Sequence, residues 1–167
     1  MRKALWIVLL VVFSRALCYS QAIDSLMIEG SKLQNIEKYS AAIEVYNSIL
    51  NLDGNHCNAI YQKALCLMRT QKASEALELY LKLIDIRPDF IGGVYGAATA
   101  YVSLKNWNKG MDYINIVITA EPENAEYYII RGQIYLEMAE KKKACNDFKK
   151  AKKLGSLDAK IIMKIHC

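Results

Sequence analysis

The sequence contains few of the residues that interrupt helices or build catalytic and metal-binding sites. Among its 167 residues are only two prolines and eight glycines, so long helices are expected. Its two histidines, His56 and His166, each precede a cysteine, but neither has the further ligands or catalytic groups that a zinc site or a nucleophile needs. The sequence also lacks a Gly-rich phosphate loop, a nucleophile elbow and a His-Glu-x-x-His motif. We therefore expect no enzymatic activity, no metal and no cofactor.

The chain has only a small excess of positive charge. It contains 22 Lys and Arg residues against 17 Asp and Glu residues, but three of the basic residues precede Gln21. From Gln21 onward 19 basic residues face 17 acidic ones, which gives no reason to expect nucleic acid as a partner. Nine lysines gather between Lys141 and Lys164, and their helical spacing indicates a solvated surface rather than a site for an acidic partner.

Only one long hydrophobic run is present, over residues 4–13. A basic pair at residues 2–3 precedes this run, and a short segment ending at Ser20 follows it, as in a secretory signal peptide. We predict a signal peptide at residues 1–20, with residues 16–18 as an alternative end, and hence an exported protein that is periplasmic or secreted. The run has about half of the roughly 20 apolar residues that span a bilayer, so we favour cleavage over a membrane anchor formed by residues 1–20.

Small residues recur at a spacing of 34 residues, in two sets. The first set is Gly30, Ala64, Ala98 and Gly132, and the second is Ala42, Ala76, Gly110 and Ala144. Because paired helices approach closely only where side chains are small, this period predicts stacked helical hairpins. The repeats fall at 23–56, 57–90, 91–124 and 125–158, without insertion or deletion.

A further helix is predicted at the C-terminus, within residues 157–167, where it would cap the last repeat. Asp158 can cap the N-terminus of this helix. An apolar stripe is expected to face the preceding hairpin, and it consists of Leu157, Ile161, Ile162 and Ile165. The predicted fold class is therefore all-α, an α-solenoid of four hairpins and a capping helix.

Bulky residues and prolines follow the same period. A bulky residue lies four positions after each member of the second small set, and we expect it to pack beside that small residue of its own helix. These bulky residues are Tyr46, Tyr80, Ile114 and Phe148. Pro88 and Pro122 occupy equivalent positions, where a helix must already have ended. This pattern resembles the tetratricopeptide repeat over residues 23–158, and in particular small exported bacterial proteins of that family.

The resemblance implies a binding role for the first helices of the repeats. In the tetratricopeptide family these helices line a concave groove that binds peptides, and the equivalent positions here are largely apolar and aromatic. The implied partner-binding residues are Met27, Tyr61, Leu65, Tyr95 and Ile129. Gly92 and Gly96 would leave a shallow gap beside the two tyrosines, or would only soften their helix. An alternative is that packing between neighbouring helices covers these positions.

The cysteines divide into two pairs with different expectations. Cys57 and Cys66 share one predicted helix at a separation of about 13.5 Å, beyond the roughly 7 Å limit for a disulfide. We expect Cys66 to be packed and Cys57 to lie near a helix start, without a redox role. Cys145 and Cys167 lie on the two arms of a predicted antiparallel hairpin, at nearly equal distances from its turn. In an oxidising compartment they are expected to form a disulfide.

The function expected from these observations is a non-enzymatic scaffold that binds a protein or peptide in an exported compartment. Neither nucleic acid nor a small-molecule substrate is expected, and the membrane becomes a partner only if residues 1–20 are retained. Two alternatives remain open. One is a membrane-anchored assembly component of an envelope complex, and the other is a thiol-redox protein.

Overall fold

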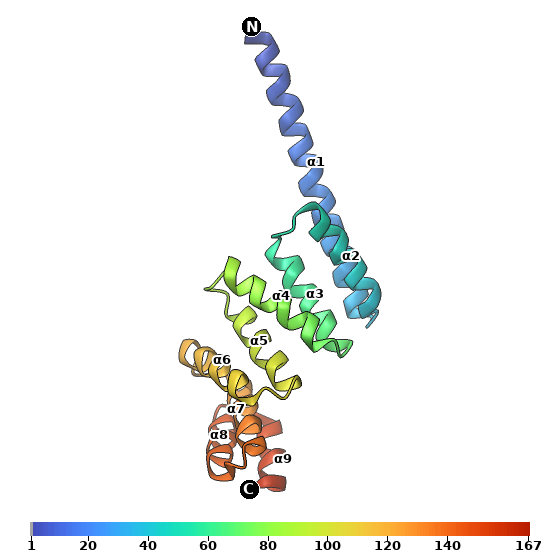
Figure 1. The fold of residues 1–167 in the computed structure, drawn as a ribbon. Helices are drawn as coiled ribbons and strands as arrows, with labels where there is room; N and C mark the ends of the chain where they lie inside the picture. Colours follow the sequence, from blue (N-terminus) through green and yellow to red (C-terminus); the bar gives the residue numbers. More distant parts are fainter. Residues whose placement is uncertain (1) are drawn as a thin grey trace. The chain divides into compact units, whose positions relative to one another are not determined.

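A computed structural model describes the backbone of residues 2–167 and the side chains from Tyr19 to Cys167. Over residues 2–167 the chain forms nine α-helices and no strand (Figure 1), which confirms the predicted all-α class. The helices are α1 (Arg2–Asn35), α2 (Tyr39–Leu52), α3 (Cys57–Arg69), α4 (Ala73–Ile86), α5 (Ile91–Ser103), α6 (Trp107–Ala120), α7 (Ala125–Glu137), α8 (Lys141–Lys153) and α9 (Leu157–His166). The predicted signal peptide, residues 1–20, lies outside the described side chains except for Tyr19 and Ser20.

The helix boundaries repeat with the spacing of the small residues. The helices α3, α5 and α7 begin at Cys57, Ile91 and Ala125, at intervals of 34 residues, and the helices that follow them have the same interval. Pro88 and Pro122 lie in the loops that follow α4 and α6, as predicted, because a helix cannot continue normally through proline. Only short loops separate consecutive helices along the chain.

The turn after each first helix contains a residue in the left-handed region of φ. These residues are Glu37, Gln71, Lys105 and Ala139, with φ of 59°, 61°, 58° and 60°. The backbone N–H of the next residue bonds back across the helix end in three turns, as Lys38 does to the Leu33 carbonyl oxygen at 2.9 Å. Asn106 and Glu140 donate equivalent bonds to Tyr101 and Tyr135. This pattern satisfies carbonyl groups that the helix end would leave without partners.

Aromatic rings of the second helices cover glycines of the first helices. A Cβ atom on Gly30 would lie 2.6 Å from Cε1 of Tyr46, and one on Gly132 would lie 2.4 Å from Cε1 of Phe148. The expectation that each bulky residue packs beside the small residue of its own helix is therefore incomplete. The ring fills space on the facing helix, where glycine allows the two backbones to approach.

The expected shallow gap at Gly96 is also filled by a ring. A Cβ atom on Gly96 would lie 2.3 Å from Cε1 of Tyr80, so this position is covered by α4 and offers no opening for a partner. Of the two alternatives for Gly96, a gap or a softer helix, the gap is excluded, because Tyr80 packs against the helix that follows its own. Gly96 thus serves helix packing.

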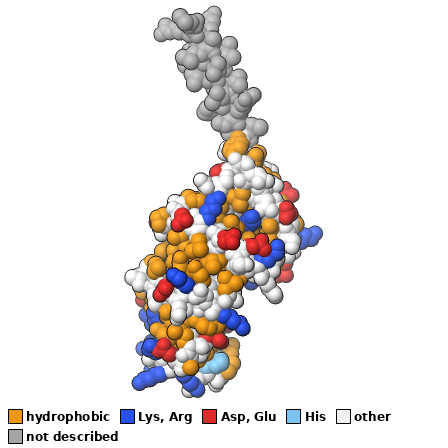
Figure 2. Space-filling model, in the orientation of Figure 1, with side chains coloured by type: hydrophobic (Ala, Val, Ile, Leu, Met, Phe, Trp, Pro, Cys, Tyr) orange, Lys and Arg blue, Asp and Glu red, His pale blue; other side chains and the backbone are white. Residues whose placement is uncertain are grey.

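The chain divides into two compact units, residues 1–70 and residues 71–167. A cluster of buried residues in the first unit consists of Ile23, Ala42, Tyr46, Ile49, Ala59 and Cys66. A cluster of buried residues in the second unit consists of Val94, Ala98, Ile114, Val117, Ile118, Tyr127, Tyr128, Ile134, Ala151 and Ala159. On the face shown in Figure 2, charged side chains of both signs are scattered among patches of hydrophobic side chains.

Candidate functional site

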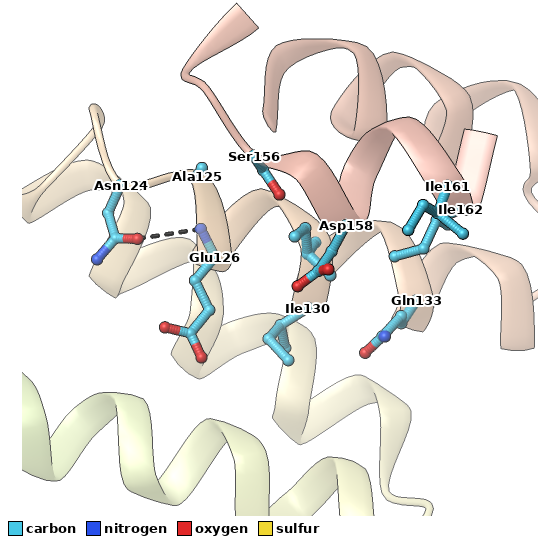
Figure 3. A pocket seen from close by; sticks show the side chains of 10 residues that line it. Asn124, Ala125, Glu126, Ile130, Gln133, Ser156, Asp158, Ile161 and Ile162 are labelled. Atoms are coloured by element: carbon cyan, nitrogen blue, oxygen red, sulfur yellow. Dashed lines mark hydrogen bonds between the residues drawn. The ribbon is translucent and has the colours of Figure 1, made fainter. Parts of the chain in front are cut away.

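A pocket lies between α7 and α9, in the second unit. It has a volume of about 700 Å³. From α7 and its N-cap it is lined by Asn124, Ala125, Glu126, Ile129, Ile130 and Gln133, and from α9 and its N-cap by Ser156, Asp158, Ile161 and Ile162 (Figure 3). Four isoleucines form its apolar part, and two carboxyl groups and two amide side chains supply polar groups. A mainly apolar cavity of this size with a few polar groups is typical of a binding site.

Both helices that form the pocket begin with a side-chain cap. The Oδ1 of Asn124 accepts a hydrogen bond from the Glu126 backbone N–H at 3.0 Å, and this bond is drawn in Figure 3. The Oγ of Ser156 accepts a hydrogen bond from the Ala159 backbone N–H at 3.1 Å. The prediction of Asp158 as the cap of α9 was wrong, because Ser156 precedes the helix and already accepts that bond. Asp158 lies in the first turn instead. Its negative charge there interacts favourably with the helix dipole, and its side chain lines the pocket.

Helix α9 is held by few buried side chains. Ala159 is its one buried residue, and Ile162 is half-buried. The prediction that the apolar stripe packs inward was wrong for Leu157, Ile161 and Ile165, which are 77%, 59% and 70% exposed. These three residues are spaced by four along the helix and lie on a face that α8 does not cover. No later helix is available among the described residues to pack against that face.

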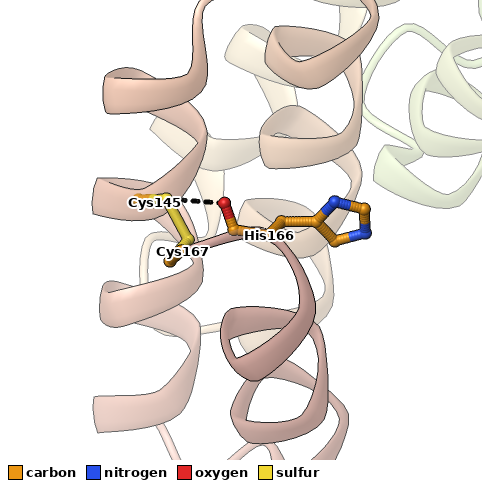
Figure 4. Close-up of a disulfide and its surroundings, with 3 residues drawn as sticks. All are labelled: Cys145, His166 and Cys167. Carbon is orange, nitrogen blue, oxygen red and sulfur yellow. Dashed lines mark hydrogen bonds between the residues drawn. A yellow bond between two sulfur atoms is a disulfide. The ribbon is translucent and has the colours of Figure 1, made fainter.

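A disulfide joins the end of α9 to α8. The sulfur atoms of Cys145 and Cys167 are bonded in the structure, and the two Cα atoms lie 5.8 Å apart (Figure 4). The carbonyl oxygen of His166 lies 4.0 Å from the Sγ of Cys145. The two arms of the hairpin are nearly equal in length, and they bring the two cysteines level. The bond therefore attaches Cys167, which directly follows α9, to α8.

Two predicted binding residues lie at or beside the pocket. Ile129 lines it directly. The hydroxyl of Tyr95 donates a hydrogen bond to Oε1 of Glu126 at 2.7 Å, and its ring centroid lies 5.1 Å from that of Tyr127. Tyr95 thus connects α5 to a residue of the pocket wall. Both predicted residues are half-buried, so part of each side chain packs within the second unit.

The other three predicted binding residues belong to the first unit. Met27 is half-buried and packs against the core of that unit, and Tyr61 is also half-buried. Leu65 lines a smaller pocket of about 320 Å³ together with polar side chains. Its other lining residues are Ser31, Gln34, Asn35, Tyr39, Gln62 and Arg69. This pocket is separate from the one between α7 and α9 and shares no residue with it.

A charged network that was not predicted from the sequence holds α7 against its neighbours. The Arg131 guanidinium donates to both carboxylate oxygens of Asp147 on α8, at 2.7 and 2.8 Å, and to Oδ1 of Asn115 on α6 at 2.9 Å. Asp147 is only 6% exposed, and its hydrogen bond raises the pKa of Arg131. One signal was present in the sequence: Asp147 occupies a repeat position that is Leu79 and Tyr113 in the two preceding repeats.

The histidine and cysteine side chains that could suggest catalysis or metal binding lie in structural positions. Nδ1 of His56 accepts a hydrogen bond from the Ala59 backbone N–H at 3.2 Å, so His56 caps α3. Cys66 is buried as predicted, and burial raises the pKa of its thiol to about 11. Cys57 is the first residue of α3, also as predicted. Among the described residues, no group of three or more His, Cys, Asp or Glu side chains is arranged to hold a metal ion.

The described residues also contain no helix with the length and apolar character needed to cross a membrane.

Comparisons with known proteins agree with the helical repeat. Residues 35–116 match the family model described as "Anaphase-promoting complex, cyclosome, subunit 3", and residues 125–154 match the model described as "Tetratricopeptide repeat". Sperm-associated antigen 1 of Homo sapiens is 26% identical over 109 residues, which is 65% of this chain and 11% of that protein. The chain therefore spans about a tenth of the length of this human relative.

Two solved structures share the fold at low sequence identity. The structure "MamA 41-end from Desulfovibrio magneticus RS-1" has a TM-score of 0.75 at 24% identity, covering 79% of this chain and 75% of that one. The structure "Crystal structure of YrrB: a TPR protein with an unusual peptide-binding site" has a TM-score of 0.69 at 16% identity, covering 84% of this chain and 77% of that one. These similarities confirm the predicted fold class of helical hairpins with a C-terminal capping helix.

Proposed function

Because the chain belongs to the tetratricopeptide repeat family, we propose that it is a non-enzymatic scaffold that binds a protein or peptide at the pocket between α7 and α9. The family is generally one of binding scaffolds, and the similar structure of YrrB is described as having a peptide-binding site. The observation that carries the proposal is the pocket itself, which combines an apolar interior with a few polar groups at one end of the repeat series.

The lining residues define the kind of segment that fits. Ile129, Ile130, Ile161 and Ile162 offer aliphatic contacts to apolar side chains of a partner. Gln133 is exposed and can form hydrogen bonds with a peptide backbone, because its amide both donates and accepts. An extended segment or a short amphipathic helix supplies both kinds of group. Tyr95 extends the binding surface beyond the pocket, through its bond to Glu126.

Site-specific cross-linking in cells tests this proposal. A photoreactive amino acid replaces Ile129 in one variant and Ile116 in a matched control, since Ile116 is an isoleucine on α6 that is 53% exposed and lies outside the pocket. We expect a defined partner to be captured from position 129 and not from position 116. Equal capture from both positions would show that the pocket is not the binding site.

A binding titration with the captured partner then measures the contribution of the pocket. The substitution Ile129→Asp places a carboxylate among aliphatic groups, and we expect the Kd to rise at least about tenfold, which corresponds to about 1.4 kcal/mol. The control Ile116→Asp changes the same residue type on an exposed surface and should leave the Kd unchanged. A Kd that Ile129→Asp does not alter would contradict the proposal.

We further propose that the protein acts in an exported compartment after cleavage of residues 1–20. The support for this is the pattern of a basic pair followed by an apolar run near the N-terminus. Mass spectrometry of the N-terminal peptide from fractionated cells provides the test. A chain beginning near Gln21 in the exported fraction is the expected result. An intact N-terminus recovered with membranes would favour the membrane-anchored assembly component instead.

A further inference from the structure

We propose that the Cys145–Cys167 disulfide regulates the pocket between α7 and α9, because the bond holds α9 in place and its reduction releases α9 and weakens partner binding. This inference rests on the proposed function, since it concerns the same pocket. It adds a redox dependence that the family resemblance does not imply. It follows from three observations: the share of the pocket that α9 supplies, the weak packing of α9, and the position of the disulfide.

Helix α9 and its cap provide one wall of the pocket. Four lining residues come from this segment, namely Ser156, Asp158, Ile161 and Ile162. The opposite wall belongs to α7, which the Arg131–Asp147 ion pair fixes to α8 independently of α9. Movement of α9 would therefore remove half of the aliphatic contacts and leave α7 as an open helix surface.

Few side chains of α9 are buried against the rest of the protein, so noncovalent contacts hold this helix only weakly. The helix has ten residues, and isolated helices shorter than about 12 residues are marginal in water. Ala159 is its one buried residue, and three of its large apolar side chains are mostly exposed. The turn before it is held by backbone hydrogen bonds of Gly155 to the Lys152 carbonyl oxygen and of Ser156 to the Ala151 carbonyl oxygen, both at 3.1 Å.

The connection at the start of α9 is suited to a hinge. Gly155 has φ of 93°, and a Cβ atom built at this residue would meet nothing within 4 Å. A glycine in open space can change its backbone angles at low cost. The segment from Leu157 to Cys167 is therefore attached by a permissive hinge at one end and by the disulfide at the other. Loss of the disulfide leaves the hinge and the packing of Ala159, Ile162 and Met163, of which only Ala159 is fully buried.

The switching reaction is a thiol–disulfide exchange with a dithiol reductant. A thiolate of the reductant attacks Sγ of Cys167, which is exposed, and forms a mixed disulfide while Cys145 leaves as a thiolate. The second thiol of the reductant then displaces Cys167 and forms the reductant's own disulfide. Two electrons pass to the protein, and two protons complete the two thiols. The reverse exchange with an oxidised dithiol restores the bond. Cys66 does not compete, because it is buried.

The sequence separation of the two cysteines gives the size of the effect. They are 22 residues apart, and in the chain-entropy model a closed loop of this length favours the ordered state by roughly 100- to 300-fold. We therefore expect the protection of α9 amides against hydrogen exchange to fall by about that factor on reduction. Amides in the middle of α7 should change much less, because α7 keeps its contacts with α6 and α8.

The first experiment measures hydrogen exchange by mass spectrometry on the whole protein, with and without dithiothreitol. A Cys145→Ser/Cys167→Ser variant should show fast exchange over α9 in both conditions. A Cys57→Ser variant is the matched control, since it removes a thiol that is not in the disulfide and should keep the response to dithiothreitol. Unchanged exchange over α9 after reduction would overturn the inference, whether or not the pocket binds a partner.

The second experiment compares cross-linking from a photoreactive amino acid in place of Ile129, in cells, with the disulfide present or removed by Cys145→Ser/Cys167→Ser. Release of α9 together with at least a tenfold lower yield of the cross-linked product is the expected result. Release of α9 with an unchanged yield would overturn the regulation and leave the proposed function intact. No product in either form would instead overturn the proposed function, and the regulation with it.

Discussion

Because the Phe148 ring packs closely over Gly132, we can predict whether the substitution Gly132→Ala raises or lowers the stability of the protein. Gly132 lies in the interior of α7, where alanine is normally the better residue by about 1 kcal/mol. A Cβ atom at this position would lie 2.4, 2.8 and 2.9 Å from three ring carbons of Phe148. Because Phe148 is fully buried, its ring cannot move into solvent to make room. We therefore expect Gly132→Ala to destabilise the protein.

The expected magnitude follows from two opposing contributions. Overpacking of a core usually costs about 1–3 kcal/mol, and three contacts below 3.0 Å place Gly132→Ala near the upper end of that range. The helix propensity of alanine offsets about 1 kcal/mol of this cost. The net loss is then about 2 kcal/mol, which for a chain of this size lowers the Tm by about 4–8 °C.

Thermal unfolding followed by circular dichroism measures this change, and two further variants separate its causes. In the Phe148→Leu background the ring is absent, so the cost of Gly132→Ala should fall below about 1 kcal/mol. The control Gly110→Ala adds a methyl group to another helix interior, where the nearest atom is Cγ2 of Val102 at 3.1 Å, and its effect should be small. A higher Tm for Gly132→Ala would refute the packing argument.

Two further predictions concern buried polar groups. Arg131→Met leaves the Asp147 carboxylate buried without its partner and should cost about 3–5 kcal/mol in urea denaturation, whereas Arg131→Met combined with Asp147→Leu should be closer to neutral. An equal loss in the single and double variants would contradict this. Burial raises the pKa of the Cys66 thiol from its ordinary value of 9.0 to about 11, so its contribution to stability is present below about pH 9 and is lost as the pH rises to about 11. The urea midpoint should fall over that interval, and Cys66→Ala should reduce the fall.

The helices and their spacing could be predicted because both depend on local sequence. The recurrence of small residues and the positions of Pro88 and Pro122 reflect where each helix is crowded and where it must end. The buried state of Cys66 followed from the same periodicity. The pairing of Cys145 with Cys167 required only the lengths of two arms around one turn, and the structure joins these residues.

Contacts between helices were harder to predict, because they depend on the rotation and displacement of one helix relative to another. The ring of Tyr80 covers Gly96 on the following helix, and a count along the sequence does not reveal that. The apolar stripe of α9 suggested burial, but burial requires a partner helix on that side, and Leu157 has none among the described residues. The ion pair between Arg131 and Asp147 likewise depends on how far α7 and α8 are displaced along their axes relative to each other.

The residues with positive φ in the four turns are positions where a substitution can stabilise the protein. Glu37, Gln71, Lys105 and Ala139 adopt a backbone conformation that glycine adopts more readily than any of them. Replacing one of these residues with glycine should raise the free energy of unfolding by about 0.5–1 kcal/mol, measurable as a higher urea midpoint. The four turns are thus positions at which a later substitution can compensate for a destabilising one elsewhere, so other residues can change while the chain remains folded.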